Sequence, residues 1–366
     1  MIQSLLGEFR FKLQRYVDSA GVTSDFFSEK GFFQANLRSS LLNEYLERGI
    51  LVYSYRELSK HIGKVFGIQL SPSGIDNCIL QAGEETSKSL QSSIALSQQN
   101  SMPPIVKAAE MDLYAETAQE AHLFYDGIGV KRQAAVRSDN PDKAAYQKYK
   151  SNKNKPKKVN SDIAVLQVGD EIQYALGGLD SQGEQLYSTM ECVQYLLKKT
   201  YENNPKPLRL VAITDGASNI RTNLTEYIDT DICIILDWYH LEKKVYSLNS
   251  MFSVGNSKDK KKHAQSILAW LWEGNVPQAL SYMGKLGIKN QEKYQELTDY
   301  LQRHQHEIVN YKKRKEVGGV IGSGRGEKAN DTIIAKRQKN AALAWSDVGS
   351  NALGIMAMKH LNKTNK

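Results

Sequence analysis

The sequence predicts a mixed α/β fold, with strands and helices alternating along a chain of 366 residues. The runs RLVAIT (209–214) and DICIIL (231–236) are short, apolar and rich in β-branched residues, which is typical of strands buried on both faces of a sheet. Longer segments between and after them space their apolar residues as helices do. At about 150 residues per domain, the length predicts two or three domains, enough for a sizeable core.

The first 50 residues carry apolar side chains at three- and four-residue spacing, as at Leu5, Leu6, Phe9, Leu13 and Tyr16. This spacing repeats about once per helical turn. We therefore expect a helical start to the chain.

A pair of helices is predicted between residues 54 and 85. Ser54 is placed to cap a helix that runs to about Phe66, and Gly67 gives the turn that follows. Ser71 or Ser73 is placed to cap the second helix. Two short helices around a glycine turn are typical of a helix–turn–helix that reads the major groove, although helical pairs that only pack together share this pattern.

Alternating strands and helices begin after a polar, proline-containing stretch at 95–107. We expect one strand at 122–132 and a hairpin of two strands within 162–178, turning at Gly169 and Asp170. The two apolar runs complete the set of five. Their order predicts three antiparallel strands followed by parallel strands reached through helical crossovers.

Three units follow from this order. No strand pattern occurs in 258–312, and helical spacing returns from Glu327 to the end of the chain. The units are a helical region with a helix–turn–helix-like DNA-binding segment (1–100), a catalytic α/β core (115–257 and 313–366) and an all-helical insertion (258–312).

The net charge of +8 is concentrated in two places. Residues 131–160 hold ten Lys or Arg against two Asp, so this segment alone equals the excess of the whole chain. Residues 312–339 hold nine basic against three acidic residues. Such clustering is typical of a protein that binds a polyanion, and it predicts double-stranded DNA as partner. The alternative for each cluster is a solvated surface loop.

Composition excludes several classes of protein. The three cysteines are isolated, with no C-x-x-C pair, which excludes a disulfide framework and a cysteine-rich zinc module. A hydrophobic fraction of 41% excludes an intrinsically disordered chain. No run of 18 apolar residues and no signal peptide occur, so we expect no membrane partner and a cytoplasmic, nucleoid-associated protein.

Three acids stand where strand ends or a helix start bring side chains together. Asp126 lies in the first core strand, Asp215 directly follows RLVAIT, and Glu327 follows GSGRG. Ligands of open α/β sheets bind at strand ends, where loops converge. Grouped carboxylates repel one another unless cations neutralise them, and their hard oxygens suit Mg²⁺ or Mn²⁺, the ions of two-metal phosphoryl transfer. Taken singly, an Asp-Gly pair is also an ordinary turn dipeptide.

The order of these motifs resembles the RNase H-like core of DDE transposases. DG at 126, DGASNI at 215, DWYH at 237 and GRGEKAND at 324 follow one another as in that family. DWYH is similar to the C/D-x-x-H signature of Mutator-like and related bacterial insertion-sequence transposases. The run 320–353 looks like the closing segment of one bacterial insertion-sequence group, and the long interval before Glu327 is similar to members with an all-helical insertion.

This resemblance covers roughly residues 115–360. It implies that Asp126, Asp215 and Glu327 bind Mg²⁺ or Mn²⁺ as a catalytic triad, with His240 as a further catalytic residue. The implied reaction is hydrolytic nicking of DNA at the ends of an element, followed by attack of the freed 3′-hydroxyl on target DNA. Because two ends are brought together, a homo-oligomer is implied.

Secondary candidates surround these residues. His240 lies three residues after Asp237, so on a helix the two share one face, either to reach DNA or to fix the helix start. Asp331 is a reserve metal ligand, and Trp345 is a candidate for stacking on a base. Basic side chains predicted to hold DNA phosphates are Lys153, Lys155, Lys157, Lys158, Arg325, Lys328, Lys336 and Arg337.

Two alternatives stay open at this stage. Related transposases often carry a cysteine-rich N-terminal module that this chain lacks, so a truncated or catalytically silent DNA-binding descendant is one. Another RNase H-like nuclease, which cuts without joining strands, is the other. Three intact acids favour catalysis.

Overall fold

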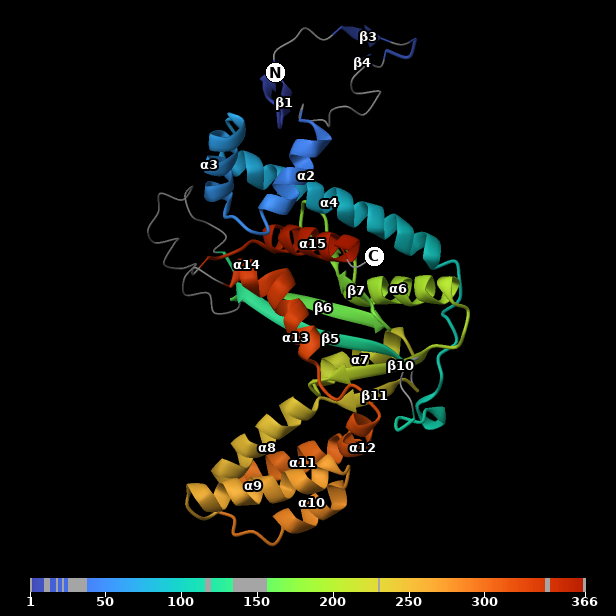
Figure 1. The fold of residues 1–366 in the computed structure, drawn as a ribbon, viewed down its shortest axis with the longest axis vertical. Coiled ribbons are helices and arrows are strands. Elements are labelled where there is room, and N and C mark those ends of the chain that lie inside the picture. Colours follow the sequence, from blue (N-terminus) through green and yellow to red (C-terminus); the bar gives the residue numbers. More distant parts are fainter. Residues whose placement is uncertain are drawn as a thin grey trace.

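The computed structural model describes residues 2–9, 14–17, 19–21, 23–25, 38–115, 120–133, 157–229, 231–339 and 343–364. Its centre is a five-stranded sheet with helices on both faces, and a group of helices extends beyond one edge (Figure 1). The strands are β5 (Glu120–Lys131), β6 (Lys158–Val168), β7 (Glu171–Leu176), β10 (Arg209–Thr214) and β11 (Cys233–Leu236). The spatial order is β11-β10-β5-β6-β7. This architecture confirms the mixed α/β class.

Strand directions also follow the prediction. β5, β6 and β7 are antiparallel neighbours, while β10 runs parallel to β5 and β11 parallel to β10. Gly169, at φ +59°, turns the β6–β7 hairpin. The crossovers are α6 (Thr189–Asn203) and α7 (Ser218–Tyr227). A small hairpin of β8 (Gly178–Leu179) and β9 (Gln185–Tyr187), absent from the prediction, precedes α6.

Alternation along β5 divides the core between two helical layers. Phe124, Ile128 and Val130 belong to the cluster on one face, whereas Leu123 and Tyr125 belong to the cluster on the other. Helices α6 and α7 cover the second face. The first face is covered by α13 (Gly324–Asn330), a π-helical turn (Asp331–Ala335), α14 (Lys336–Gln338) and α15 (Asp347–Thr364).

The described start of the chain is strand, so the expectation of helix there is wrong. β1 (Ile2–Ser4) pairs with β2 (Gly7–Phe9), and β3 (Arg15–Val17) pairs with β4 (Thr23–Asp25), both antiparallel. Gly7 at φ +112° and Gly21 at φ +78° adopt a conformation that other residues rarely reach. The glycine turns therefore favour short strands over the helix that the apolar spacing predicts. Helix α2 covers Ser40–Gly49.

The predicted helical pair is confirmed at its caps. Ser54 and Glu57 form a capping box at the start of α3 (Tyr55–Phe66), and Gly67 ends that helix at φ +68°. Ser71, rather than Ser73, caps α4 (Pro72–Ser97) by accepting from the Gly74 N–H at 3.0 Å. Whether the pair reads DNA stays a prediction.

Helix α4 is far longer than the second helix of a helix–turn–helix. It has 26 residues and packs along α15. At their crossing, a Cβ on Gly83 would lie 2.7 Å from the Cβ of Ala352, so the two backbones meet closely only because residue 83 is glycine. α4 therefore joins the N-terminal helices to the sheet layer.

The segment predicted as an all-helical insertion consists of helices where it is described. With the helix before it, the group comprises α8 (Trp238–Phe252), α9 (Ser257–Trp272), α10 (Val276–Met283), α11 (Gln291–Arg303) and α12 (Tyr311–Glu316). The rings of Trp238, Trp272 and Tyr311 pack together, with centroids 4.7 Å and 5.0 Å from that of Trp238. This aromatic contact joins the first, second and last helix of the group.

Two asparagines of α15 hydrogen-bond to the sheet backbone beside them. Asn362 accepts from the N–H of Tyr174 at 2.8 Å and donates to its carbonyl at 2.9 Å. Asn351 accepts from the N–H of Leu179 at 3.0 Å and donates to the Gly177 carbonyl at 2.7 Å. Each side-chain amide thus accepts one hydrogen bond from the backbone and donates one to it, as the backbone of a neighbouring strand would.

A charged cluster lies buried at the start of β5. The Arg314 guanidinium, from α12, is fully buried and donates to both carboxylate oxygens of Glu120, at 3.2 Å and 2.7 Å. It also donates to the carbonyls of Val320 and Leu113. His122 lies 2.9 Å from Glu120 on the other side. The cluster ties the helical group to the sheet.

No helix in the described parts of the chain combines the length and apolar character needed to cross a bilayer. Cys78, Cys192 and Cys233 are free and buried.

Candidate functional site

The register of the parallel strands brings two predicted acids side by side. Phe124 of β5 pairs with Ile213 of β10. Two residues further along each strand stand Asp126 and Asp215. Because neighbouring strands lie about 4.8 Å apart, the two carboxylates share one end of the sheet.

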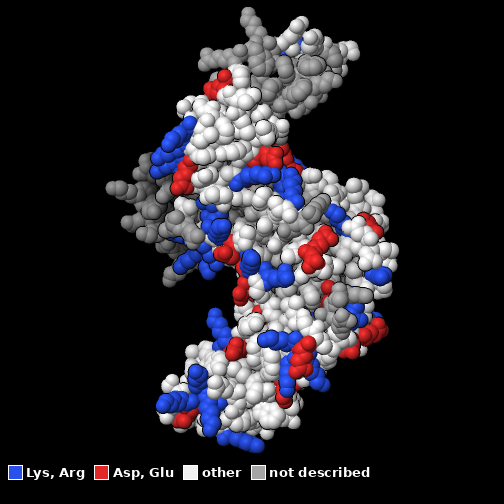
Figure 2. All heavy atoms as spheres, viewed as in Figure 1, with Lys and Arg blue, Asp and Glu red and all other residues white. Residues whose placement is uncertain are grey.

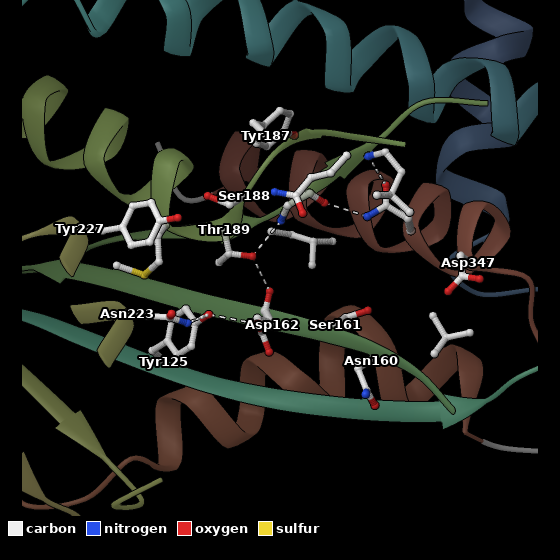
Figure 3. A pocket seen from close by; sticks show the side chains of 17 residues that line it. Tyr125, Asn160, Ser161, Asp162, Tyr187, Ser188, Thr189, Asn223, Tyr227 and Asp347 are labelled. Carbon is white, nitrogen blue, oxygen red and sulfur yellow. Dashed lines mark hydrogen bonds between the residues drawn. The ribbon is translucent and has the colours of Figure 1, made fainter. Parts of the chain in front are cut away.

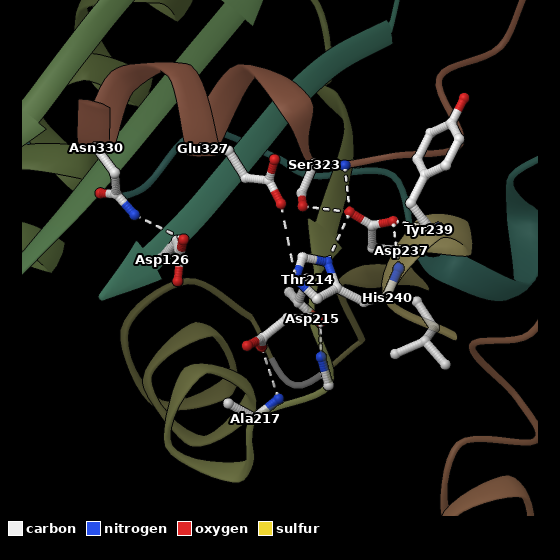
Figure 4. Close-up of polar contacts among 12 residues, drawn as sticks. Asp126, Thr214, Asp215, Ala217, Asp237, Tyr239, His240, Ser323, Glu327 and Asn330 are labelled. Atoms are coloured by element: carbon white, nitrogen blue, oxygen red, sulfur yellow. Dashed lines mark hydrogen bonds and ion pairs between the residues drawn. The ribbon is translucent and has the colours of Figure 1, made fainter. Parts of the chain in front are cut away.

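A third aspartate continues this row. Thr214 pairs with Leu236 of β11, and Asp237 comes next. The N–H of Asp237 donates to the Thr214 carbonyl at 2.7 Å, which holds the new residue beside Asp215. Asp215 and Asp237 thus follow the carboxyl ends of β10 and β11, and Asp126 lies beside them within the longer β5 (Figure 4). Strand ends of this kind are where α/β sheets bind ligands.

Asp126 is half-buried and sits among other negative charges. Its Oδ1 accepts from the Gly127 N–H at 2.7 Å, and its Oδ2 accepts from Asn330 Nδ2 at 2.6 Å. Burial raises the pKa of Asp126, and the charges of Asp215 and Glu327 raise it further, while the Gly127 hydrogen bond opposes the shift. The three predicted acids therefore act on one another electrostatically.

The turn after β10 holds Asp215 in place. The Ala217 N–H donates to Asp215 Oδ1 at 2.9 Å. Gly216 adopts φ +86°, and a Cβ there would lie 2.8 Å from Leu236, so this turn requires glycine. The Asp-Gly pair is thus a turn and an acid site at once.

Residues of the helical group contact the backbone of this turn. Tyr300 Oη lies 3.5 Å from the Asp215 carbonyl, and its ring packs on His304. The His304 Nδ1 lies 2.6 Å from Glu307, which also pairs with Arg221 of α7. A buried ion-pair cluster of the helical group therefore supports the backbone of Asp215.

Asp237 and His240 form the pair that their spacing predicts. Asp237 is buried and caps α8 by accepting from the N–H groups of Tyr239, at 2.6 Å, and His240, at 3.2 Å. Its Oδ2 accepts from the Ser323 N–H at 2.7 Å and from the hydroxyl of that residue. Burial alone would raise the pKa of Asp237, but hydrogen bonds from His240 and Ser323 lower it to about 2.

His240 bridges Asp237 and Glu327. Its Nδ1 donates to Asp237 Oδ2 at 3.2 Å, and its Nε2 lies 3.7 Å from Glu327 Oε1. The hydrogen bond to Asp237 raises the pKa of His240, and the nearby charges of Glu327 and Asp215 add to that effect against partial burial. The pair fixes the helix start and contacts Glu327, while its contact with DNA stays a prediction.

Replacing Asp237 by Ala is expected to lower the free energy of unfolding by roughly 2–3 kcal/mol, because a helix cap is lost and Ser323 keeps unpaired donors. The low pKa of Asp237 means that its contribution is complete above about pH 4 and is lost as the pH falls through 2. Urea unfolding at pH 7 and pH 3 measures both effects. Asp237→Asn, which keeps the capping oxygen, is the matched control; equal stability of the Ala variant and the native chain at pH 7 would contradict this account.

Glu327 approaches from α13, across the row of aspartates. Its side chain is 60% exposed and turns toward His240. Asn330, one helical turn later, is the residue that contacts Asp126. The reserve ligand Asp331 is exposed and begins the π-helical turn instead. Asn330 and Asp331 lie three and four residues after Glu327, on either side of its helical face, and the Asn330 side of that face contacts Asp126.

The donor chemistry at this edge fits a hard cation. Carboxylate oxygens are the ligands that Mg²⁺ prefers, and the buried Oδ1 of Asn330 has no hydrogen-bond partner. Among the described residues, however, no three His, Cys, Asp or Glu side chains are positioned to hold one ion as they stand. Glu327 is engaged by His240, and its exposed side chain must turn toward the aspartates for three carboxylates to meet.

The basic residues predicted to hold DNA divide into three groups. Lys157, Lys158, Arg325, Lys328 and Lys336 are exposed. Lys153 and Lys155 lie outside the described residues. Blue side chains line both walls of a hollow in the molecule between the core and the helical group, with acids between them (Figure 2).

Arg337 is half-buried and contacts the fold. The rings of Tyr55 and Trp345 have centroids 5.8 Å and 5.6 Å from its guanidinium, which donates to the Ile50 carbonyl at 3.1 Å. Arg337 therefore joins the N-terminal helices to the core, and its contact with DNA stays a prediction. Trp345 is buried and donates to the Gln338 carbonyl, so it is not available to stack on a base.

Sequence reasoning missed the partners that arrive from distant elements. Asn330 was detectable, since it follows Glu327 by three residues and so shares its helical face. Ser323, Tyr300 and His304 carry no local signal, because each acquires its role only when the helical group packs on the strand ends.

A second hollow lies on the opposite face of the sheet, where Tyr125 and Asp162 point (Figure 3). It is a cavity of about 240 Å³. Several of its polar groups bond to one another: Tyr125 donates to Asp162 at 3.1 Å, Asn223 donates to Tyr125 at 3.1 Å, and Thr189 donates to the Asp162 carbonyl at 2.8 Å. This cavity is separate from the acid row.

Comparisons with known proteins add little. No protein-family model matches this chain, and no curated protein matches it. Among solved structures, the chain is similar to a Drosophila P element transposase strand transfer complex, with a TM-score of 0.29 and 9% identity over 92% of this chain and 85% of that one. At that TM-score the likeness supports no conclusion about this chain.

Proposed function

We propose that this protein is a DNA transposase of the DDE type, with an RNase H-like catalytic core, that cleaves DNA and joins strands by metal-dependent phosphoryl transfer. The observation that carries the proposal is that Asp126 and Asp215 lie side by side on neighbouring strands, with Glu327 on the helix that covers them. Asp126 and Glu327 are 201 positions apart in the sequence, yet Glu327 lies on the same helix as Asn330, which contacts Asp126. A like-charge cluster at strand ends is costly unless it serves a cation.

Asp126, Asp215 and Glu327 would hold Mg²⁺ or Mn²⁺ at this edge. When bound, such ions activate a water or a 3′-hydroxyl and stabilise the leaving oxygen. The chain positions these ligands by three means: the turn at Gly216, the Asn330 amide on Asp126, and the brace of Tyr300 behind Asp215.

His240 supplies the positive charge of the site in this mechanism. Asp237 fixes the ring by accepting from Nδ1, which leaves Nε2 directed at Glu327. A protonated His240 compensates the Glu327 carboxylate while no substrate is bound. When Glu327 turns toward the aspartates, Nε2 becomes a donor for a phosphate oxygen of the DNA.

Exposed basic residues around the site support DNA as the substrate. Lys157, Lys158, Arg325, Lys328 and Lys336 offer charge to the phosphate backbone without reading its sequence. Holding two element ends together calls for a homo-oligomer, which we include in the proposal.

Incubating the full chain with Mg²⁺ and duplexes copied from the DNA that flanks its gene tests this function. Joined products on a target plasmid are the expected result. Cleavage without joining would instead identify another RNase H-like nuclease. Salt-sensitive binding without cleavage would identify a silent or truncated transposase-derived DNA-binding protein, and either outcome would overturn the proposal.

A further inference from the structure

One face of α8 stays uncovered from the acid row to the far end of the helix. Tyr239, Lys243, Ser247 and Ser250 are exposed and recur every three or four residues, so they form a single stripe. At 1.5 Å per residue, the 15 residues of α8 rise about 22 Å, the length of about six base pairs. We refer to these four residues as the α8 stripe.

The α8 stripe carries groups that suit a nucleic-acid backbone. Lys243 has no ion-pair partner within the described residues, and no acidic side chain falls on the stripe. The nearest acid on the helix, Glu242, is half-buried and lies about 100° around the axis from Lys243. The Lys243 ammonium and the Ser247 hydroxyl are donors on this stripe, whereas the Ser250 hydroxyl donates to the Ser247 carbonyl at 2.7 Å.

Tyr239 forms the end of the stripe beside the acids. Its side chain is 59% exposed, although it is a large aromatic residue next to the site. The ring rests against Gly322, where a Cβ would lie 2.6 Å from two ring carbons. Residue 322 must therefore be glycine for the ring to occupy this place, and the neighbouring His240 faces Glu327.

Two lysines lie at the other end of α8. Lys260 Nζ donates to the Ser250 carbonyl at 3.0 Å, and the backbone N–H of Lys289 donates to the Phe252 carbonyl at 2.8 Å. The carbonyl end of a helix favours cations. Two like charges at this end also provide a place for an anion such as a phosphate.

We propose that the α8 stripe binds the backbone of duplex DNA flanking the cleavage site, with Tyr239 stacking on the base nearest the cut. This inference rests on the proposed function and names the surface that carries the substrate beyond the acids. Helix α8 leads from the sheet into the helical group (Figure 1), and basic side chains lie on both sides of the hollow between that group and the core (Figure 2). DNA along the α8 stripe would run from the acid row toward Lys260 and Lys289.

Fluorescence anisotropy tests the proposal with the full chain, a 30-base-pair duplex and the same duplex with a three-nucleotide unpaired 3′ end. Lys243→Ala is expected to reduce the slope of log affinity against log salt by about 0.9, the effect of one phosphate contact. Tyr239→Ala is expected to weaken binding of the unpaired end roughly tenfold, whereas Tyr239→Phe stays within about twofold because stacking needs only the ring.

Lys206→Ala is the matched control for charge. Lys206 is exposed and precedes β10, at the end of that strand opposite Asp215. Lys206→Ala changes the net charge by the same amount as Lys243→Ala. It should leave both the affinity for DNA and the slope of log affinity against log salt as in the native chain. Thermal melting of each variant verifies that the fold is intact.

Two results together would overturn the α8 assignment: a slope of log affinity against log salt in Lys243→Ala equal to that of the native chain, and an unchanged affinity of Tyr239→Ala for the unpaired end. The proposed DNA cleavage would not be affected by them. An equal loss in Lys206→Ala would overturn it too, because the effect would then be one of net charge. A native chain that binds neither duplex at low salt would overturn both this inference and the proposed function.

Discussion

Replacing Asp215 by Asn is expected to reduce DNA cleavage and joining at least about a thousandfold while leaving DNA affinity within about twofold. A metal ion is worth several kcal/mol of charge stabilisation in such a transition state, and each 1.36 kcal/mol is a factor of ten in rate. Asp215 stands between Asp126 and Asp237 in the row of strand ends, so an amide there removes one charge from the centre of the site. Cleavage rates with Mg²⁺ and anisotropy without it measure the two halves of the prediction.

Asp170→Asn makes the same substitution elsewhere and serves as the control. Asp170 is exposed at the β6–β7 turn, at the other end of the sheet from Asp126. Activity of Asp215→Asn equal to that of Asp170→Asn would remove Asp215 from the site.

Replacing Arg314 by Leu is expected to destabilise the fold by about 3–5 kcal/mol, because the Glu120 carboxylate stays buried without its main partner. The guanidinium is fully buried and makes four hydrogen bonds, two of them to Glu120. Urea unfolding at pH 7 measures the loss. The double variant Glu120→Gln with Arg314→Leu should lose less than the sum of its single changes, because no charge is left unpaired.

The pH dependence of the same variants distinguishes charge from packing. Burial opposes ionisation of Glu120, but hydrogen bonds from His122 and Arg314 keep its pKa below the ordinary value of 4.5. The native chain therefore loses stability as the pH falls from about 4.5 through that lower pKa. In Arg314→Leu, Glu120 lacks its main counter-charge and burial raises its pKa, so acidification should recover part of the lost stability. A parallel decline in both proteins would show that packing alone accounts for the difference.

Much of the sheet was predictable because its signals are local. RLVAIT became β10, Gly169 turned a hairpin, and Ser54 capped the helix that its spacing indicates. The convergence of Asp126 and Asp215 followed from one rule, that parallel strands end at the same edge. These features depend on a few consecutive residues or on strand order.

The remaining features depend on partners that come from far along the chain. Arg314 and Glu120 are 194 positions apart, and no residue next to either of them in the sequence indicates that they form an ion pair. Arg337 is one of many basic residues near the C-terminal cluster, yet its guanidinium contacts the rings of Tyr55 and Trp345. Charge in a sequence indicates binding only where packing leaves it at the surface.

Helix spacing failed for a different reason. Asn330 and Asp331 both lie near the helical face of Glu327, and spacing alone does not decide which of them contacts Asp126; the packing of the helix on β5 selects Asn330. At the start of the chain, glycines with positive φ turned an apolar pattern into short strands.

The asparagines of α15 also bear on how copies of this protein can associate. An outermost strand with free N–H and C=O groups is a template for the strand of another molecule, and such pairing leads to aggregation. Asn362 occupies both backbone groups of Tyr174, and Asn351 occupies the Gly177 carbonyl and the Leu179 N–H. Lateral growth of the sheet past β7 is thereby blocked at these residues, so another chain cannot extend the sheet there by strand pairing.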